Sequence, residues 1–171
     1  TTIANTMTSN QKKIDPKTVD RYIRGLTDSL LFYEVRRYNI KGKEFLTTVN
    51  KYYTTDIGMR NMLVKGKESD VGHILENLVY LELKRRGYEV YVGKLDSAEI
   101  DFIAVKQENK LYIQVAQEIG SPETEKREYG RLLDIRDNYP KYVLRTDVFT
   151  GGNYEGIKTM HIADFLLSNE Y

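Results

Sequence analysis

Residues 71–116 read VGHILENLVYLELKRRGYEVYVGKLDSAEIDFIAVKQENKLYIQVA, and the spacing of the apolar residues changes at Gly87. Before Gly87, apolar residues recur every three or four positions from Val71 to Leu83, which predicts a helix over 71–86. After Gly87, short apolar runs predict strands at 89–93, 99–105 and 110–115, with a hairpin turn over 106–109. A helix followed by three strands indicates an α+β fold.

The chain beyond this stretch continues the same domain. A polar helical pattern over 122–137 begins at Pro122, a strand is predicted at 141–145, and a short helix follows at 162–167. The predicted order is therefore helix, three strands, helix, strand. We expect residues 68–171 to form an α/β domain with a central mixed sheet.

The N-terminal part has a different pattern. A short helix is predicted over 3–10, and Asp15 and Pro16 are typical of the start of a second helix, over 16–31. Strands are then predicted at 32–40, 44–48 and 51–55, with a turn over 41–43. Two helices followed by a basic hairpin are the order of a winged helix-turn-helix, in which the second helix enters a major groove and the hairpin contacts phosphates. We expect this domain to span residues 1–67.

Charge is distributed unevenly between these two parts. The 171 residues contain 26 Lys and Arg against 25 Asp and Glu, a net charge of +1. Residues 1–67 hold 13 basic and 6 acidic side chains, a net of +7, and the remainder has a net of −6. A basic half indicates a nucleic-acid partner, although a solvated surface or a joint between protein domains can have the same composition. The candidate nucleic-acid-binding residues are Lys17, Arg21, Arg24, Arg36, Arg37, Lys41 and Lys43.

Composition excludes several classes of site. Without cysteine, the chain has no disulfide or thiolate zinc site, and its two histidines exclude a histidine-rich metal site. No apolar run approaches the roughly 18–20 residues that span a bilayer, and no signal peptide is present, so we expect a cytoplasmic protein without membrane contact. The chain lacks an initiator Met and opens within a helical pattern, which indicates a fragment of a longer protein.

Three polar residues in the second half are candidates for catalysis. Glu76 lies within the apolar helix, Asp101 lies within an apolar strand, and Gln114 lies on the next strand. Carboxylates on neighbouring central strands can bind Mg²⁺, which would activate water and neutralise charge on a phosphate. Each of these residues can also have a purely structural role. Glu76 can pair with a neighbouring side chain, and Gln114 can be a hydrogen-bonded amide. His73, one turn before Glu76, is more typical of a structural histidine.

Several segments spread over the chain form a recognisable set: the runs 72–79, 86–90, 99–102 and 112–115, together with Tyr22, Asp28, 37–43 and 52–60. In these segments the chain resembles the C-terminal region of prokaryotic AAA+ family ATPases. The resemblance implies a winged helix followed by a PD-(D/E)XK nuclease-like domain, with the ATPase module upstream as a partner. No Gly-x-x-x-x-Gly-Lys-Ser/Thr loop occurs, so this chain is not expected to bind ATP by that route.

The resemblance assigns the nuclease site residue by residue. It implies catalytic roles for Glu76, Asp101 and Gln114, with Asp101 and Glu76 as the Mg²⁺ ligands, but Ala116 stands where the motif lysine belongs. That lysine would orient or deprotonate the attacking water, so another lysine, such as Lys84 or Lys94, would have to replace it.

The sequence therefore predicts the non-ATPase region of an AAA+ type ATPase that binds DNA or a partner and has a degenerate nuclease-like site. Two other functions stay open. One is an active Mg²⁺-dependent endonuclease that uses the three candidate residues. The other is a protein-interaction or dimerisation module whose acidic half docks a partner. The net charge of −6 in residues 68–171 disfavours the endonuclease, because phosphates would be repelled unless metal ions offset the carboxylates.

Overall fold

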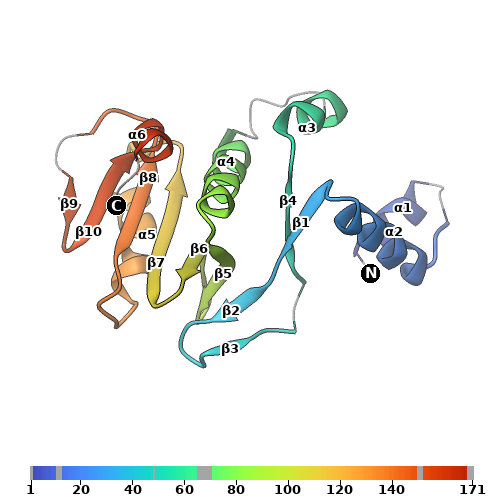
Figure 1. Cartoon of the computed structure of the whole chain (residues 1–171), viewed down its shortest axis with the longest axis horizontal. Coiled ribbons are helices and arrows are strands. Elements are labelled where there is room, and N and C mark those ends of the chain that lie inside the picture. The colour runs from blue at the N-terminus through green and yellow to red at the C-terminus, as the bar shows by residue number, and fades with distance from the viewer. Residues whose placement is uncertain (1, 11–12, 48, 65–70, 150–151, 169–171) are drawn as a thin grey trace.

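The computed structural model describes residues 2–10, 13–47, 49–64, 71–149 and 152–168. It is a mixed α+β structure, as the sequence predicts (Figure 1). Its elements are α1 (Thr2–Ser9), α2 (Pro16–Asp28), β1 (Phe32–Val35), β2 (Arg37–Asn39), β3 (Glu44–Phe45), β4 (Lys51–Thr54), α3 (Ile57–Val64), α4 (Val71–Arg85), β5 (Glu89–Leu95), β6 (Ala98–Lys106), β7 (Asn109–Ala116), α5 (Pro122–Leu133), β8 (Lys141–Arg145), β9 (Asn153–Tyr154), β10 (Ile157–His161) and α6 (Ile162–Leu167).

The main body is a mixed eight-stranded sheet with the order β3-β2-β5-β6-β7-β8-β10-β9. β6 pairs antiparallel with both β5 and β7. β8 pairs in parallel with both β7 and β10. The parallel pair β7–β8 requires a crossover, and α5 provides it. The mixed sheet that was predicted for the second half is confirmed.

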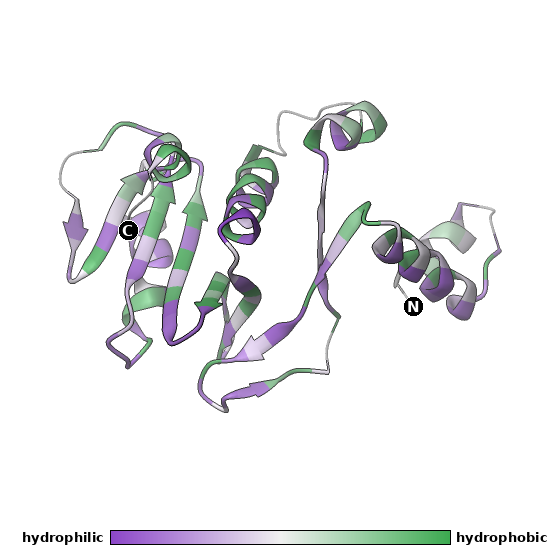
Figure 2. Ribbon diagram, viewed as in Figure 1, coloured by the Kyte–Doolittle hydropathy of each residue, from purple (hydrophilic) through white to green (hydrophobic). Residues whose placement is uncertain are grey.

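Helices cover both faces of this sheet (Figure 1). Val79 and Leu83 of α4 pack with Phe165 of α6 in a core on one face. Tyr129 and Leu132 of α5 pack in a second core on the other face. Figure 2 shows apolar residues concentrated on α4, β7 and β8, whereas polar residues dominate α2. The second half is thus a three-layer arrangement, which buries both faces of its central strands.

Helix ends follow the predicted signals. The Asp15 side chain accepts a hydrogen bond from the Lys17 backbone N–H, and Pro16 occupies the first turn of α2. Gly87 follows α4 with a φ of +82°, a conformation that glycine adopts without strain. In the described ranges, no helix combines the length and the apolar character that crossing a membrane requires.

The hairpin of the first half is bent and joins the large sheet. At its base β1 pairs with β4, and at its tip β2 pairs with β3. β2 also pairs in parallel with β5, with Tyr38 opposite Gly93. The tip of the predicted wing therefore extends the sheet of the second half. The predicted boundary between residues 67 and 68 lies outside the described residues, and the division into two domains stays a prediction.

Several predicted elements needed correction. The strand predicted over 32–40 divides at Arg36, because β1 pairs with β4 and β2 pairs with β5. The helix predicted over 16–31 ends at Asp28, and Leu30 has a φ of +58°. The helix predicted over 122–137 ends at Leu133. α3, β9 and β10 were not predicted, because their segments are short and have no marked periodicity.

Candidate functional site

The contact between α4 and β4 positions the candidate site. The Asn77 side chain accepts a hydrogen bond from the Thr54 N–H and donates one to the Thr54 carbonyl, both at 2.9 Å. Among the described residues, β1 is the one strand that pairs with β4, so this amide takes the place of a second neighbouring strand. Next to it, the Tyr53 ring stacks on Tyr80 of α4, with centroids 4.4 Å apart. These contacts hold β4 beside Glu76.

Glu76 is buried between α4 and β4, with 8% of its surface exposed. Its Oε1 accepts hydrogen bonds from the Tyr53 hydroxyl and the Lys51 ammonium group. The His73 Nδ1 lies 3.9 Å from its Oε2. Burial raises the pKa of Tyr53, and the negative charge of Glu76 raises that pKa further, so the phenol stays protonated and donates. The acid predicted on the helix is thus held by two residues of β4.

Glu99 extends this cluster along β6. Its Oε1 lies 3.5 Å from the Lys51 ammonium group, and its Oε2 pairs with the Arg37 guanidinium. Arg37 also donates from Nε to the Val49 carbonyl at 2.9 Å. Burial favours a raised pKa for Glu99, but Arg37 and Lys51 outweigh burial and lower that pKa. Glu76, Lys51, Glu99 and Arg37 therefore form a chain of alternating charges.

Asp101 and Gln114 lie where β6 and β7 separate. The backbone ladder between these strands begins at Phe102, opposite Ile113. Beyond it, the Val115 N–H donates to Asp101 Oδ2 at 2.8 Å, and the Asp101 N–H donates to Gln114 Oε1 at 3.4 Å. The two side chains thus complete backbone hydrogen bonds that the separated strands cannot make to each other. This agrees with the structural interpretation of Gln114, which is 2% exposed.

Asp101 lies in an unfavourable place for a negative charge. Burial, and then the negative charge of Glu76, raise its pKa to about 7. The hydrogen bond from the Val115 N–H and the positive charge of Lys51 act in the opposite direction. Electrostatics link Asp101 to Glu76 and Lys51, and the Asp101 N–H bonds to Gln114, so the three candidate residues lie in one region. Their catalytic roles stay a prediction.

The arrangement does not fit Mg²⁺, which needs several oxygen atoms directed at one point. The Glu76 Oε1 accepts from Tyr53 and Lys51, and the Asp101 Oδ2 accepts from Val115. Across the described ranges, no group of three or more His, Asp or Glu side chains could hold a metal ion. The positive charge beside the acids comes from the protein's own ammonium group.

Sequence reasoning missed Lys51. Ala116 is buried in the second apolar core, so the position of the motif lysine belongs to the packing of that core. Lys94 donates to the Ser97 carbonyl at 2.9 Å, and Lys84 is exposed on α4. Lys51 instead reaches the acids from β4. One signal was present: Lys51 and Tyr53 are two residues apart and so share a strand face.

The seven candidate nucleic-acid-binding residues fall into separate groups. Lys17, Arg21 and Arg24 are exposed on α2 and, with Asp20, line a hollow of about 330 Å³. The other four lie on or near the tip of the hairpin. The Arg36 guanidinium lies 3.8 Å from the centre of the Phe45 ring, and Arg37 belongs to the acidic cluster. Lys41 pairs with Asp96 at 3.3 Å, and Lys43 lies in the β2–β3 turn.

Comparison with known proteins finds long relatives. No family model matches the chain. An uncharacterised protein of Haemophilus influenzae is 42% identical over 165 residues, which cover 96% of this chain and 40% of that protein. An uncharacterised protein of Methanocaldococcus jannaschii is 32% identical over 128 residues, covering 72% of this chain and 28% of that protein. The chain thus spans well under half the length of these two relatives.

Proposed function

We propose that the chain is a DNA-binding module whose buried acidic cluster is a degenerate nuclease-like site. The observation that carries the proposal is the exposed face of α2. Lys17, Arg21 and Arg24 follow one another at spacings of four and three, which places them on one side of the helix. Within the described part of the chain, none of them forms an ion pair with a carboxylate, so all three are available to phosphates.

The acidic cluster supports the degenerate site. Lys51 and Arg37 already neutralise Glu76 and Glu99, and Ala116 replaces the motif lysine. A metal ion would have to displace Lys51 from Glu76 before it could use that carboxylate. We assign the cluster to the joint between α4, β4 and β6, where it links the hairpin to the large sheet.

The finer fold and the wider context are part of the same proposal. The order α4, β5, β6, β7, α5, β8 supports a PD-(D/E)XK nuclease-like domain, and α1, α2 and the bent hairpin support a winged-helix relative. The resemblance to AAA+ family ATPases leads us to propose that the chain corresponds to their non-ATPase C-terminal region, in the cytoplasm. Both relatives extend far beyond the matched segment, which supports a larger parent protein.

Binding to duplex DNA across a salt series tests the proposal. We expect the double variant Arg21→Gln/Arg24→Gln to bind more weakly and to reduce the slope of log affinity against log salt by about 2, because two phosphate contacts are lost. Fluorescence anisotropy with a labelled duplex measures both quantities. The matched control is Lys84→Gln/Lys126→Gln, which removes two exposed cations from α4 and α5.

Equal slopes for the wild type and the α2 variant would overturn DNA binding by α2. In that case the alternative is a protein-interaction module, which a different observation favours. α3 has no buried residue, and its Met62 and Leu63 are 73% and 70% exposed. Light scattering that reports more than one chain per particle, together with absent DNA binding, would support this alternative.

A further inference from the structure

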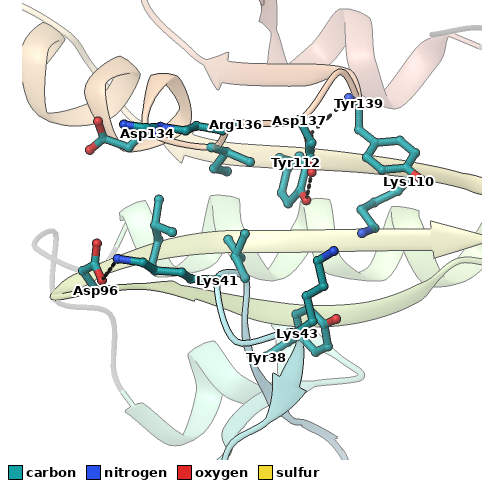
Figure 3. A pocket seen from close by; sticks show the side chains of 13 residues that line it. Tyr38, Lys41, Lys43, Asp96, Lys110, Tyr112, Asp134, Arg136, Asp137 and Tyr139 are labelled. Carbon is teal, nitrogen blue, oxygen red and sulfur yellow. Dashed lines mark hydrogen bonds and ion pairs between the residues drawn. The ribbon is translucent and has the colours of Figure 1, made fainter.

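A cleft of about 750 Å³ lies at the edge where the hairpin tip meets the large sheet. Its walls come from the β2–β3 turn and the β5–β6 turn on one side and from the segment between α5 and β8 on the other, with β7 between them (Figure 3). The volume is in the range of small-molecule sites, which is roughly 300–1,000 Å³. Figure 1 places this edge of the sheet far from α2.

Two lysines face the same space in this cleft. Lys43 extends from the β2–β3 turn and Lys110 extends from β7, and their ammonium groups point toward one another (Figure 3). In the described part of the chain, neither lysine forms an ion pair with a carboxylate. Two like charges that converge on one space repel each other, and an anion between them removes this repulsion.

The acidic residues of the cleft leave these lysines available. Asp96 pairs with Lys41 at 3.3 Å. Asp137 accepts a hydrogen bond from the Tyr112 hydroxyl at 2.6 Å and lies 3.4 Å from the Lys141 ammonium group. The carboxylate of Asp134 lies at the other end of the cleft from Lys110 (Figure 3). The end of the cleft at Lys43 and Lys110 is therefore positive.

An aromatic surface lies beside this positive end. The Lys110 ammonium group is 4.8 Å from the centre of the Tyr139 ring, and Tyr139 is 41% exposed. Tyr38 also lines the cleft, next to Lys43 (Figure 3). Basic groups interleaved with accessible aromatic rings are typical of sites that bind a phosphate and stack its base.

We propose that this cleft binds a phosphorylated nucleoside, either as a free nucleotide or as the phosphorylated end of a single strand. The phosphate lies between Lys43 and Lys110, and the base lies against Tyr139. The cleft is a second site, separate from α2, and it does not depend on duplex binding by that helix. Both ligands present the same groups, a phosphate and a base. Titration with each of them shows which one the cleft prefers.

Isothermal titration with four probes tests the cleft: AMP, 5′-phosphorylated oligothymidine, the same oligonucleotide without its phosphate, and inorganic phosphate. We expect AMP or the phosphorylated oligonucleotide to bind at least about tenfold more tightly than inorganic phosphate and the unphosphorylated oligonucleotide, each of which lacks one part of the ligand. Tighter binding of AMP indicates a free nucleotide, and tighter binding of the phosphorylated oligonucleotide indicates the end of a single strand. Lys43→Gln/Lys110→Gln is expected to lower that affinity at least about tenfold, because both phosphate contacts are lost.

Two further variants separate the parts of the proposal. Tyr139→Ala is expected to remove the advantage of AMP over inorganic phosphate. A variant on the α5 surface away from both sites, Lys126→Gln, is expected to leave AMP binding unchanged, and AMP binding is measured separately from duplex binding, so a failure of duplex binding and a failure of the cleft are distinguishable. Thermal melting of each variant confirms that it is folded. Equal affinity of the wild type and the lysine variant, or no binding of either phosphorylated probe at about 1 mM, would overturn the proposal.

Discussion

Replacing Asn77 by alanine is expected to lower the free energy of unfolding by about 3 kcal/mol, because two buried backbone groups lose their hydrogen-bond partner. The Asn77 amide is the partner of both the N–H and the carbonyl of Thr54, and both residues are 4% exposed. An alanine leaves both groups away from water without a replacement. Urea denaturation, monitored by circular dichroism, measures the change.

Asn50→Ala is the matched control for this experiment. The Asn50 amide donates to the Glu34 carboxylate at 2.7 Å in an exposed position, where water can replace it. We expect this control to cost less than about 1 kcal/mol. Equal losses for the two variants would show that the Asn77 amide does not hold β4 against α4, and with it Lys51 against Glu76.

Replacing Lys51 by methionine is expected to destabilise the protein by about 3 kcal/mol at neutral pH, because the buried Glu76 carboxylate and the half-buried Glu99 carboxylate lose their shared cation. Lys51 pairs with both Glu76 and Glu99, and its charge also favours ionised Asp101. Lys41→Met is the matched control, since its pair with Asp96 is about 70% exposed on both sides. We expect that control to cost less than about 1 kcal/mol.

The loss in the Lys51 variant should depend on pH. Asp101 has a pKa of about 7 in the folded protein against 3.8 as its ordinary value, so the folded state binds more protons between these values. Its contribution to stability therefore falls as the pH rises from about 4 to about 7. Without Lys51 this fall is larger and extends to higher pH, because Asp101 loses a charge that lowers its pKa. Urea denaturation of the wild type and of the Lys51 variant at pH 5 and pH 8 measures this dependence, and an equal loss at both values would contradict the electrostatic role of Lys51 beside Asp101.

Local signals in the sequence predicted the helices and central strands well. The helix over 71–86 and its Gly87 end follow from apolar spacing and from a residue that tolerates positive φ. The β6–β7 hairpin follows from two apolar runs around a short polar turn. The pairing of β2 with β5 was not predictable in this way, because it joins strands separated by about 50 residues of chain and no local pattern specifies such a partner.

In the candidate site, too, some residues could be predicted from local sequence and others could not. An acid or amide within an apolar segment is visible in sequence, which is why Glu76, Asp101 and Gln114 were identified. Arg37 was instead predicted to contact DNA and Lys51 was predicted for no site, because both lie in the hairpin of the helix-turn-helix interpretation. Only the packing of β4 on α4 and of β2 on β5 brings these two cations to the acids.

We propose that the module binds nucleic acid and that its acidic cluster, neutralised by Lys51 and Arg37, does not cleave it. The most direct test incubates supercoiled plasmid with Mg²⁺ or Mn²⁺ and either the wild-type protein or Asp101→Asn. Asparagine keeps an oxygen that can accept from the Val115 N–H, so the variant is matched in shape. We expect equal, background nicking by both proteins. Nicking by the wild type at least about tenfold faster than by the variant would contradict it and establish the endonuclease.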